Sequence, residues 1–467
     1  MNTKRIELLS KEPVTKAILT MSIPVVLGMM IQVLYNLVDT FFIGILGDPK
    51  QLAAVNITTP LFMLMMAIAG IVGTGASSYI SRCLGEKDYE KANKTLSTGI
   101  AISIGLGVLV TIIGSILISS IAKSLGASEE TFPFVLDYSI VLFLGSVPIM
   151  CNYAIGQLLR SEGAAMGAMK GMLIGTVSNI ILDPIFIFGF HMGIQGAAIA
   201  TVLGNALGLA YYIFYIASGK SFVKFRIKSI SLDKQIWKQI FIIGTPATIS
   251  QILMGVAMVV CNNLAVKYGD VIVAGMGVAA KIMTIGTFVF MGFSAGCQPI
   301  VGYNFGAKNF HRMKDVIIKG MLITSGIGIV LTAIFGIFAR GLIGVFTPLT
   351  DVVLQGTIIL RALIWSLPFL GAQMIAATTV QAMGNAGASL FLSITRQGVF
   401  YIPLLLTLNN LFEFKGLIYA QPLSDTLTLA VAIPVLIIII KKSIEQNEMY
   451  IVLNDESQPN IINTDTL

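Results

Sequence analysis

The chain has 467 residues, of which 55% are hydrophobic and only 11% are charged, and its formal net charge is +7. Soluble proteins carry about 25% charged residues, so the composition argues against a soluble domain and for a chain dissolved mostly in lipid. The positive charge lies in short segments between hydrophobic runs and not in one patch, which disfavours nucleic-acid binding.

Hydrophobic runs of about 20 residues recur along the chain, and each is long enough to cross a bilayer as a helix. The sequence therefore predicts an all-α polytopic membrane protein with about twelve transmembrane helices. The polar start and the length of the first run predict that no signal peptide is cleaved. The expected spans are residues 17–41, 53–80, 95–121, 133–157, 165–190, 195–217, 239–264, 271–300, 316–339, 353–380, 387–409 and 416–440.

Lysine and arginine residues mark one side of the predicted bundle. Most of the 30 lie in the N-terminus, in alternate loops and beside the C-terminus, with a dense group in residues 219–238. This positive-inside bias predicts a multi-pass protein of the plasma (cytoplasmic) membrane with both termini in the cytoplasm. The opposite loops hold only Lys50, Lys123, Lys267, Arg340 and Lys415.

The second half of the chain repeats landmarks of the first. Four of them recur in the same order after 220 to 222 residues: Pro24 and Pro246, Gly85 and Gly306, Pro148 and Pro368, and Gly163 and Gly384. We therefore expect two six-helix lobes, 1–218 and 239–442, joined by a basic cytoplasmic linker, 219–238, and followed by a cytoplasmic tail, 443–467. Because each lobe crosses the membrane an even number of times, a pseudo-twofold axis along the membrane normal should relate them.

Two lobes of like orientation favour a transporter that rocks around a central cavity, in preference to a channel or a receptor. A membrane enzyme is disfavoured, since the only histidines are His191 and His311 and there is no zinc-binding or nucleophile motif. A P-loop is absent as well, so we do not expect ATP to drive the protein, and no cofactor is predicted.

The first lobe contains two aspartates inside predicted spans, where ionisable groups are costly and mark functional sites. Gln32, Asn36 and Asp39 follow a spacing that places them on one helix face. Asn179 and Asp183 likewise share a face. The sequence therefore predicts a polar site within the first lobe.

Pro184 enriches this site in oxygen, because it cannot donate a hydrogen bond to the carbonyl of Ile180. Thr201, in the following span, can add a hydroxyl. Oxygen ligands suit a hard cation such as sodium, and two neighbouring carboxylates share a proton readily. Either ion is therefore a candidate occupant, the alternative being that each aspartate pairs with a buried lysine or arginine.

The second lobe differs in charge. At the register of the repeat, Asp39 corresponds to Cys261, so we expect the acidic site in the first lobe only. A structural ion pair between the acid and one of the cations is the favoured interpretation of the ionisable residues in its spans, which are Lys281, Arg361, Arg396 and Asp425.

Six segments between residues 10 and 440 carry a resemblance: MSIPVVLGMMIQVLYNLVDTFFIG, ASSYISRCLGEKDYEKA, NIILDPIFIFGF, GIQGAAIATVLG, YNFGAKNFHRMKD and QPLSD. With them the chain resembles the multidrug and toxic compound extrusion (MATE) family over nearly its whole length. The resemblance implies two six-helix lobes around a central cavity. It also implies export of drugs, often organic cations, in exchange for sodium ions or protons.

The resemblance further implies a cation site in the N-terminal lobe, formed by Asp39, Asn179, Asp183 and Thr201. One branch of the family also uses carboxylates in spans seven and ten. This sequence has Gln251, Cys261 and Gln373 there, so it resembles the branch that relies on the N-terminal lobe.

The implied partners are small organic drugs and the lipid bilayer, with neither nucleic acid nor an obligatory protein partner. Pro24 and Pro184 are candidate hinges. The candidates to line the cavity are Gln32, Asn36, Met63, Met66, Met254, Lys281 and Met291. The alternative is a lipid-linked oligosaccharide flippase of a related family, which would hold a diphosphate with several basic residues. Lys281, Arg361 and Arg396 keep that alternative open.

Overall fold

The structure, a computed structural model, describes residues 2–46 and 48–456, and every regular element within them is helical. Ten segments are long and apolar enough to cross a membrane, and one further span is a pair of helices bent by 55°. One of the ten, Ala386–Glu448, contains a kink at Glu413, whose φ is 51°. Arg396 and Asp425, on either side of that kink, contact each other, so the chain reverses there and makes two passes. The twelve-helix prediction is thus confirmed.

The elements in chain order are α1 (Asn2–Ser10), α2 (Val14–Ile45), α3 (Pro49–Gly85), α4 (Tyr89–Ser124), α5 (Phe132–Leu144), α6 (Ser146–Ser161), α7 (Ala165–Pro184), the π-helix η1 (Ile185–Gly189), α8 (Gly193–Ala217), η2 (Ile227–Ser229), α9 (Lys234–Ala265), η3 (Val266–Tyr268), α10 (Asp270–Gly306), α11 (Phe310–Ile337), α12 (Ala339–Phe346), α13 (Thr350–Leu363), η4 (Ile364–Ser366), α14 (Leu367–Ala382), α15 (Ala386–Ile394), the π-helix η5 (Thr395–Tyr401) and α16 (Ile402–Glu456).

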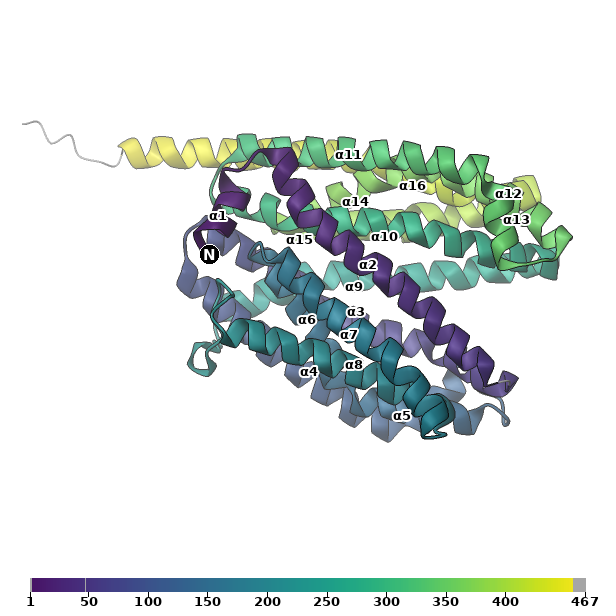
Figure 1. Cartoon of the computed structure of the whole chain (residues 1–467). Coiled ribbons are helices and arrows are strands. Elements are labelled where there is room, and N and C mark those ends of the chain that lie inside the picture. Colours follow the sequence, from purple (N-terminus) through teal and green to yellow (C-terminus); the bar gives the residue numbers. More distant parts are fainter. Residues whose placement is uncertain (1, 47, 457–467) are drawn as a thin grey trace, which may run out of the picture.

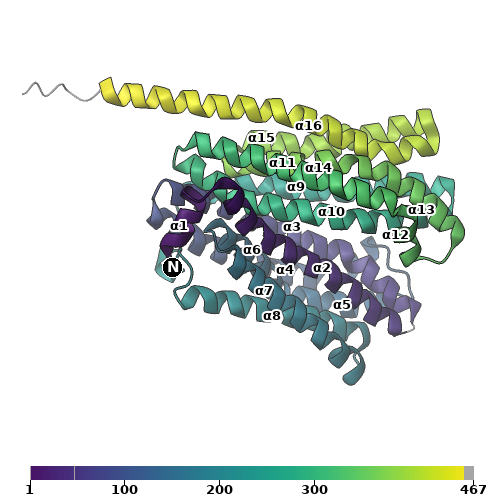
Figure 2. The ribbon, with the colours of Figure 1, turned by 45° about the horizontal axis from the view of Figure 1, so that its top comes forward.

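The helices form two lobes that lie side by side (Figures 1 and 2). Helices α2–α8 make the N-terminal lobe, and α9–α16 make the C-terminal lobe, with α3 packed on α9 and α2 packed on α10 between them. The end of the bundle that carries α1 and residues 218–233 is here the α1 end, and the opposite end, which carries α12, is the α12 end. The lobes diverge toward the α12 end (Figure 1).

Glycines allow the lobes to meet backbone to backbone at the α1 end. A Cβ atom built on Gly85 would lie 2.0 Å from the carbonyl oxygen of Tyr303, and one on Gly306 would lie 2.1 Å from that of Arg82. Tyr303 and Gly306 are the counterparts of Arg82 and Gly85 in the repeat. The two contacts are therefore images of each other, as a pseudo-twofold axis between the lobes requires.

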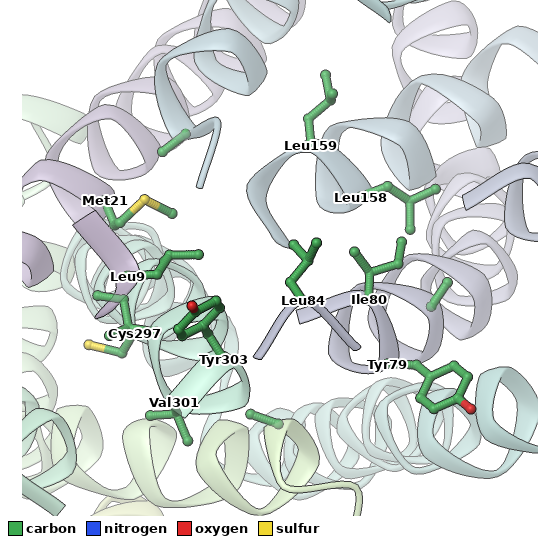
Figure 3. Close-up of a cluster of buried hydrophobic side chains, with 14 of the residues drawn as sticks. Leu9, Met21, Tyr79, Ile80, Leu84, Leu158, Leu159, Cys297, Val301 and Tyr303 are labelled. Carbon is green, nitrogen blue, oxygen red and sulfur yellow. The ribbon is translucent and has the colours of Figure 1, made fainter. Parts of the chain in front are cut away.

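The hydrophobic cores show where the lobes join and where they part. At the α1 end one cluster contains side chains of both lobes, among them Tyr79 and Cys297 (Figure 3). At the α12 end the clusters are confined to single lobes, with Ile43 in one of the N-terminal lobe and Ile272 in one of the C-terminal lobe. Continuous apolar packing thus closes the α1 end only.

Hydrogen bonds between the lobes gather toward the α1 end, with a further one midway along the bundle from Thr248 Oγ1 to the carbonyl of Ala67 at 2.8 Å. Ser78 Oγ donates to the carbonyl of Gln381 at 2.5 Å, and Arg82 Nη2 donates to Gln239 Oε1 at 2.9 Å. Helix α1 adds to this closure, since Asn304 Nδ2 donates to the carbonyl of Leu9 at 2.9 Å.

A buried carboxylate holds α1 and the linker on the N-terminal lobe. Glu162, in the turn between α6 and α7, pairs with Arg5 Nη1 at 3.0 Å. It also accepts hydrogen bonds from Ser221 Oγ at 2.8 Å and from the backbone N–H groups of Phe222 and Val223 at 2.7 and 2.9 Å. Four donors from two distant segments therefore converge on one side chain at the α1 end.

Candidate cation site

Three helices bring the predicted polar residues of the N-terminal lobe together. Helix α7 carries Asn179 and Asp183, and α8 carries Thr201. The two helices approach closely at Gly204, where a Cβ atom would lie 2.7 Å from the carbonyl oxygen of Gly175. This close approach, one helical turn from Thr201, sets its hydroxyl against Asn179.

The hydrogen bonds within the site are few and long. Asn179 Nδ2 donates to Thr201 Oγ1 at 3.3 Å and lies 3.5 Å from Asp183 Oδ1. Asp183 is fully buried, and Asn179 and Thr201 are nearly so. Helix α2 contributes Asp39, which is close enough to Asp183 for the two carboxylates to interact electrostatically.

Three buried oxygens in this site have no hydrogen-bond partner within the part of the chain that the structure describes: Asp39 Oδ1, Asn179 Oδ1 and Asp183 Oδ2. Buried polar atoms are rarely left unpaired, because losing water without gaining a partner costs about 1–3 kcal/mol for each. No lysine or arginine pairs with either aspartate among the described residues, which removes the alternative of a structural ion pair there. The arrangement fits a small hard cation or a proton, since its donors are carboxylate, amide and hydroxyl oxygens.

Sequence reasoning missed two tyrosines at this site. The hydroxyl of Tyr35 lies 3.3 Å from Thr201 Oγ1. Tyr138, on α5, is buried within electrostatic reach of both Asp39 and Asp183. Tyr35 lies four residues before Asp39, and this spacing on one helix face could have predicted its place at the site. Nothing in the sequence relates Tyr138 to α2 or α7.

The candidate hinges have different surroundings. Pro184 ends α7, and the π-helix η1 follows it at once, so the regular helical hydrogen-bonding pattern breaks beside Asp183. Pro24 lies inside α2 near its α1 end. The side chain of Asn36 is outside the described residues, and Gln32 is half-buried on α2.

The predicted cavity-lining methionines are not gathered in one place. Met66 packs against the core of the N-terminal lobe. Met63, on α3, and Met254, on α9, are exposed, as is Met291 on α10. Their role as cavity residues stays a prediction.

The three cations predicted inside spans of the C-terminal lobe have different surroundings; they are Lys281, Arg361 and Arg396. Arg396 Nε pairs with Asp425 Oδ1 at 3.0 Å, and Gln421 Nε2 donates to the same carboxylate at 3.2 Å. Asp425 is buried, so this is the structural pair that the sequence favoured between Asp425 and one of the cations, and that cation is Arg396. Cys261, the counterpart of Asp39, lies in an apolar cluster beside Tyr401.

Arg361 and Lys281 are both exposed, but on different kinds of helix face. Arg361 lies on α13 in a stripe with Leu354, Ile358 and Trp365, which are exposed and apolar. Such a stripe is suited to contact lipid, and an arginine can lay its aliphatic stem along apolar surface of this kind. In the stretch of α10 that carries Lys281, residues 274–284, no large hydrophobic side chain is exposed.

The two halves of the chain both match one protein family. Residues 24–185 and residues 246–407 each match the MatE family model. The chain belongs to the MatE family. The two matches begin and end 222 residues apart, in agreement with the repeat of two six-helix lobes.

Relatives within the MatE family extend over nearly the whole chain. The multidrug export protein MepA of Staphylococcus aureus (strain MSSA476) is 34% identical over 429 residues, which are 91% of this chain and 94% of MepA. The protein of the same name in Staphylococcus haemolyticus (strain JCSC1435) is 31% identical over 426 residues, again 91% and 94% of the two chains. The fold resembles the outward-facing conformation of a multidrug resistance MATE family transporter of the MOP superfamily. That comparison gives a TM-score of 0.90 at 28% identity and covers 94% of this chain and 98% of the other.

Proposed function

We propose that this MatE family protein exports small organic drugs across a bacterial cytoplasmic membrane in exchange for sodium ions or protons. Its relatives are multidrug export proteins, and a multidrug resistance transporter shares its fold. The observation that carries the coupling is the set of three unpaired buried oxygens on Asp39, Asn179 and Asp183. A site of that kind gains stability when a cation or proton enters it.

The distribution of charge supports an orientation. The basic linker and the polar N-terminus lie at the α1 end, so the positive-inside rule places this end in the cytoplasm. The lobes then join at the cytoplasmic side and part toward the outside, which corresponds to an outward-facing state. Rocking of the two lobes would open the α1 end and close the α12 end in turn.

Ion binding would bias this equilibrium only by its differential affinity for the two states. A cation at Asp183 would draw α2, α7 and α8 together, because its ligands come from all three helices. The interrupted helix after Pro184 is a natural place for such an adjustment, since η1 lacks the regular hydrogen-bonding pattern of an α-helix. Drug and ion would favour different arrangements of the lobe and so exchange for each other.

The flippase alternative loses its main support. It requires several basic side chains around one cavity, whereas Arg396 is paired with Asp425 and Arg361 lies on a stripe suited to lipid. Only Lys281 is left of the three cations that kept it open. One lysine is a weak binding site for a diphosphate, which usually engages several donors.

The test is ethidium transport by the purified chain in proteoliposomes, with a sodium gradient and a pH gradient imposed separately. We expect one gradient to drive transport and Asp183→Asn to abolish the response to it. Asp137→Asn is the control, since it removes an exposed carboxylate from α5 of the same lobe. Coupled transport that survives Asp183→Asn would contradict the proposed ion site, and no transport under either gradient would contradict drug–ion exchange.

A further inference from the structure

The basic linker, residues 219–238, exposes large apolar side chains beside its cations at the α1 end of the bundle (Figure 1). Ile227 is 76% exposed and Leu232 is 85% exposed. Three cations between or beside them are exposed and form no ion pair within the described part of the chain: Lys224, Arg226 and Lys228. Basic and apolar residues exposed side by side suit a membrane interface, where the first meet headgroups and the second meet acyl chains.

Hydrogen bonds hold this linker against the beginning of α4. Three of its backbone N–H groups donate to side chains of that helix: Lys224 to Asn93 Oδ1 at 2.6 Å, Arg226 to Ser97 Oγ at 3.2 Å, and Ser231 to Thr98 Oγ1 at 3.0 Å. The short helix η2, which lies between these contacts in the chain, packs on α4 as well. The contacts fix η2 at the level of Ser97 and Thr98, both of which are fully buried.

The internal repeat shows how deep this level is. Gly85 corresponds to Gly306, and at the same shift Ser97 corresponds to Ile318 of α11. Ile318 is exposed and begins an apolar stripe that continues with Leu322. Because a pseudo-twofold axis along the membrane normal keeps corresponding residues at one depth, η2 lies at a level where the other lobe exposes an apolar side chain.

Helix α4 itself gives a second measure of this depth. Its own exposed apolar stripe begins at Ile104 and continues with Val108. Ile104 lies about 9 Å further along the helix than Thr98, and the headgroup layer of a bilayer is about 5–8 Å thick. The linker therefore lies at the level of the lipid headgroups, with its exposed side chains turned away from α4.

We propose that the linker binds acidic phospholipids in the leaflet at the α1 end, which the proposed orientation makes the cytoplasmic leaflet. Lys224, Arg226 and Lys228 contact the phosphate groups, while Ile227 and Leu232 contact the upper acyl chains. The charges favour an acidic lipid over a zwitterionic one, because each basic side chain near an anionic membrane surface strengthens binding about fivefold. Free phosphate or nucleic acid would gain nothing from the apolar residues. The surface lies outside the space between the lobes, so its lipid is neither the drug nor the coupling ion.

The two tryptophans of the chain provide a reporter and a reference. Trp237 Nε1 donates to the carbonyl of Ser231 at 2.9 Å, so its fluorescence reports on the linker. Trp365 is exposed on the apolar stripe of α13. Each is studied alone, in Trp365→Phe and in Trp237→Phe. The full chain is placed in phosphatidylcholine vesicles that contain equal mole fractions of either dibrominated phosphatidylglycerol or dibrominated phosphatidylcholine, and quenching of the tryptophan by bromine is measured.

The measured quantity is the ratio of quenching by the two brominated lipids, which does not depend on the depth of the tryptophan. We expect phosphatidylglycerol to occupy the site beside Trp237 about fivefold better than phosphatidylcholine. This preference should shrink as salt is raised from 50 to about 500 mM, because salt screens exposed charges. Trp365 should show no preference.

A linker variant and a charge-matched control locate the site. The linker variant, Lys224→Gln with Arg226→Gln and Lys228→Gln, should reduce the preference at Trp237 to that at Trp365. The control removes three charges from other exposed positions at the α1 end and should keep the preference: Lys11→Gln, Lys314→Gln and Lys319→Gln. Quenching of Trp237 by brominated phosphatidylcholine should be the same in both, which shows that the fold is retained.

Two results would overturn the inference. One is equal quenching of Trp237 by the two brominated lipids in the unmodified linker at low salt. The other is an equal loss of preference in the linker variant and in the control, which would mean that the protein attracts acidic lipid by its overall charge and not through this surface.

Discussion

Replacement of Gly306 by alanine should weaken the closure of the α1 end. The new Cβ atom would lie 2.1 Å from the carbonyl oxygen of Arg82, and 2.9 and 3.0 Å from two further backbone atoms of that residue. Since contact distances between carbon atoms are about 3.5 Å or more, α3 and α10 would have to separate by roughly 1 Å. No flexible side chain can absorb this shift, because the opposing atoms belong to the backbone.

The cost of such overpacking is about 1–3 kcal/mol, which corresponds to a change of about 5- to 150-fold in the ratio of closed to open molecules. The reporter is Ser78→Cys in an otherwise cysteine-free chain, since Ser78 is buried in the contact between the lobes. We expect Gly306→Ala to raise the rate at which a water-soluble maleimide labels this cysteine in detergent by a factor in that range. Gly85→Ala should have an effect of the same size, because the pseudo-twofold axis relates the two contacts.

The control is Gly326→Ala on α11, where the added Cβ atom would meet no atom within 4 Å. It should leave labelling unchanged and stabilise the helix by about 0.5–1 kcal/mol. If Gly306→Ala labels no faster than this control, the contact between the backbones does not keep the α1 end closed, and the reasoning is refuted.

Two further predictions concern buried ion pairs. Arg396→Gln should lower the free energy of unfolding by about 3–5 kcal/mol, because it leaves the buried Asp425 without its ion-pair partner. The double variant Arg396→Gln with Asp425→Asn should recover part of this loss, as measured by thermal melts. If the single and double variants melted at the same temperature, the ion pair would not contribute to stability. At the α1 end, burial raises the pKa of Glu162 to about 7 against the pull of Arg5. The folded state then holds a proton between pH 4.5 and 7 that the unfolded state has lost, so this group makes stability fall as pH rises through that window and adds no further change above it. We expect Glu162→Gln to flatten the melting temperature between pH 5 and 7, and an unchanged pH profile would show that the carboxyl is ionised throughout.

Much of the fold could be predicted because it follows from patterns that are local or repeated. Each span has its own apolar length, and the repeated prolines and glycines indicate two equivalent lobes. Gly85 and Gly306 illustrate the reason. Where two membrane helices pack with their backbones in contact, the residues at the contact must be small, so glycine stands at the same position in both halves. The sequence could not indicate that their contacts lie only at one end of the bundle, since a rocking transporter with the same residues can close at either end.

The candidate site was only partly predictable for a similar reason. Asn179 and Asp183 share a helix turn, so their proximity follows from spacing, whereas Tyr138 reaches them through the packing of α5 in three dimensions. The direction of Arg361 and Lys281 depends on which neighbours cover each helix. Both are single cations in apolar spans. Only the structure shows that Arg361 lies among large exposed hydrophobic residues of α13, whereas Lys281 lies among small exposed residues of α10.

The two lobes share one topology but differ in whether their buried aspartates have ion-pair partners. This difference bears on the coupling of ion binding to drug export. In the C-terminal lobe the carboxylate of Asp425 is satisfied by a tethered cation, Arg396, and by Gln421. In the N-terminal lobe Asp39 and Asp183 keep unpaired oxygens. A tethered cation is present in every state and cannot shift an equilibrium between states, whereas an exchangeable ion can do so by its differential affinity. Under the proposed function, the N-terminal lobe therefore responds to the ion while the C-terminal lobe moves as a fixed body. The transporter would then have one ion site, in the N-terminal lobe. Loss of that site in Asp183→Asn would remove all response of transport to the driving gradient.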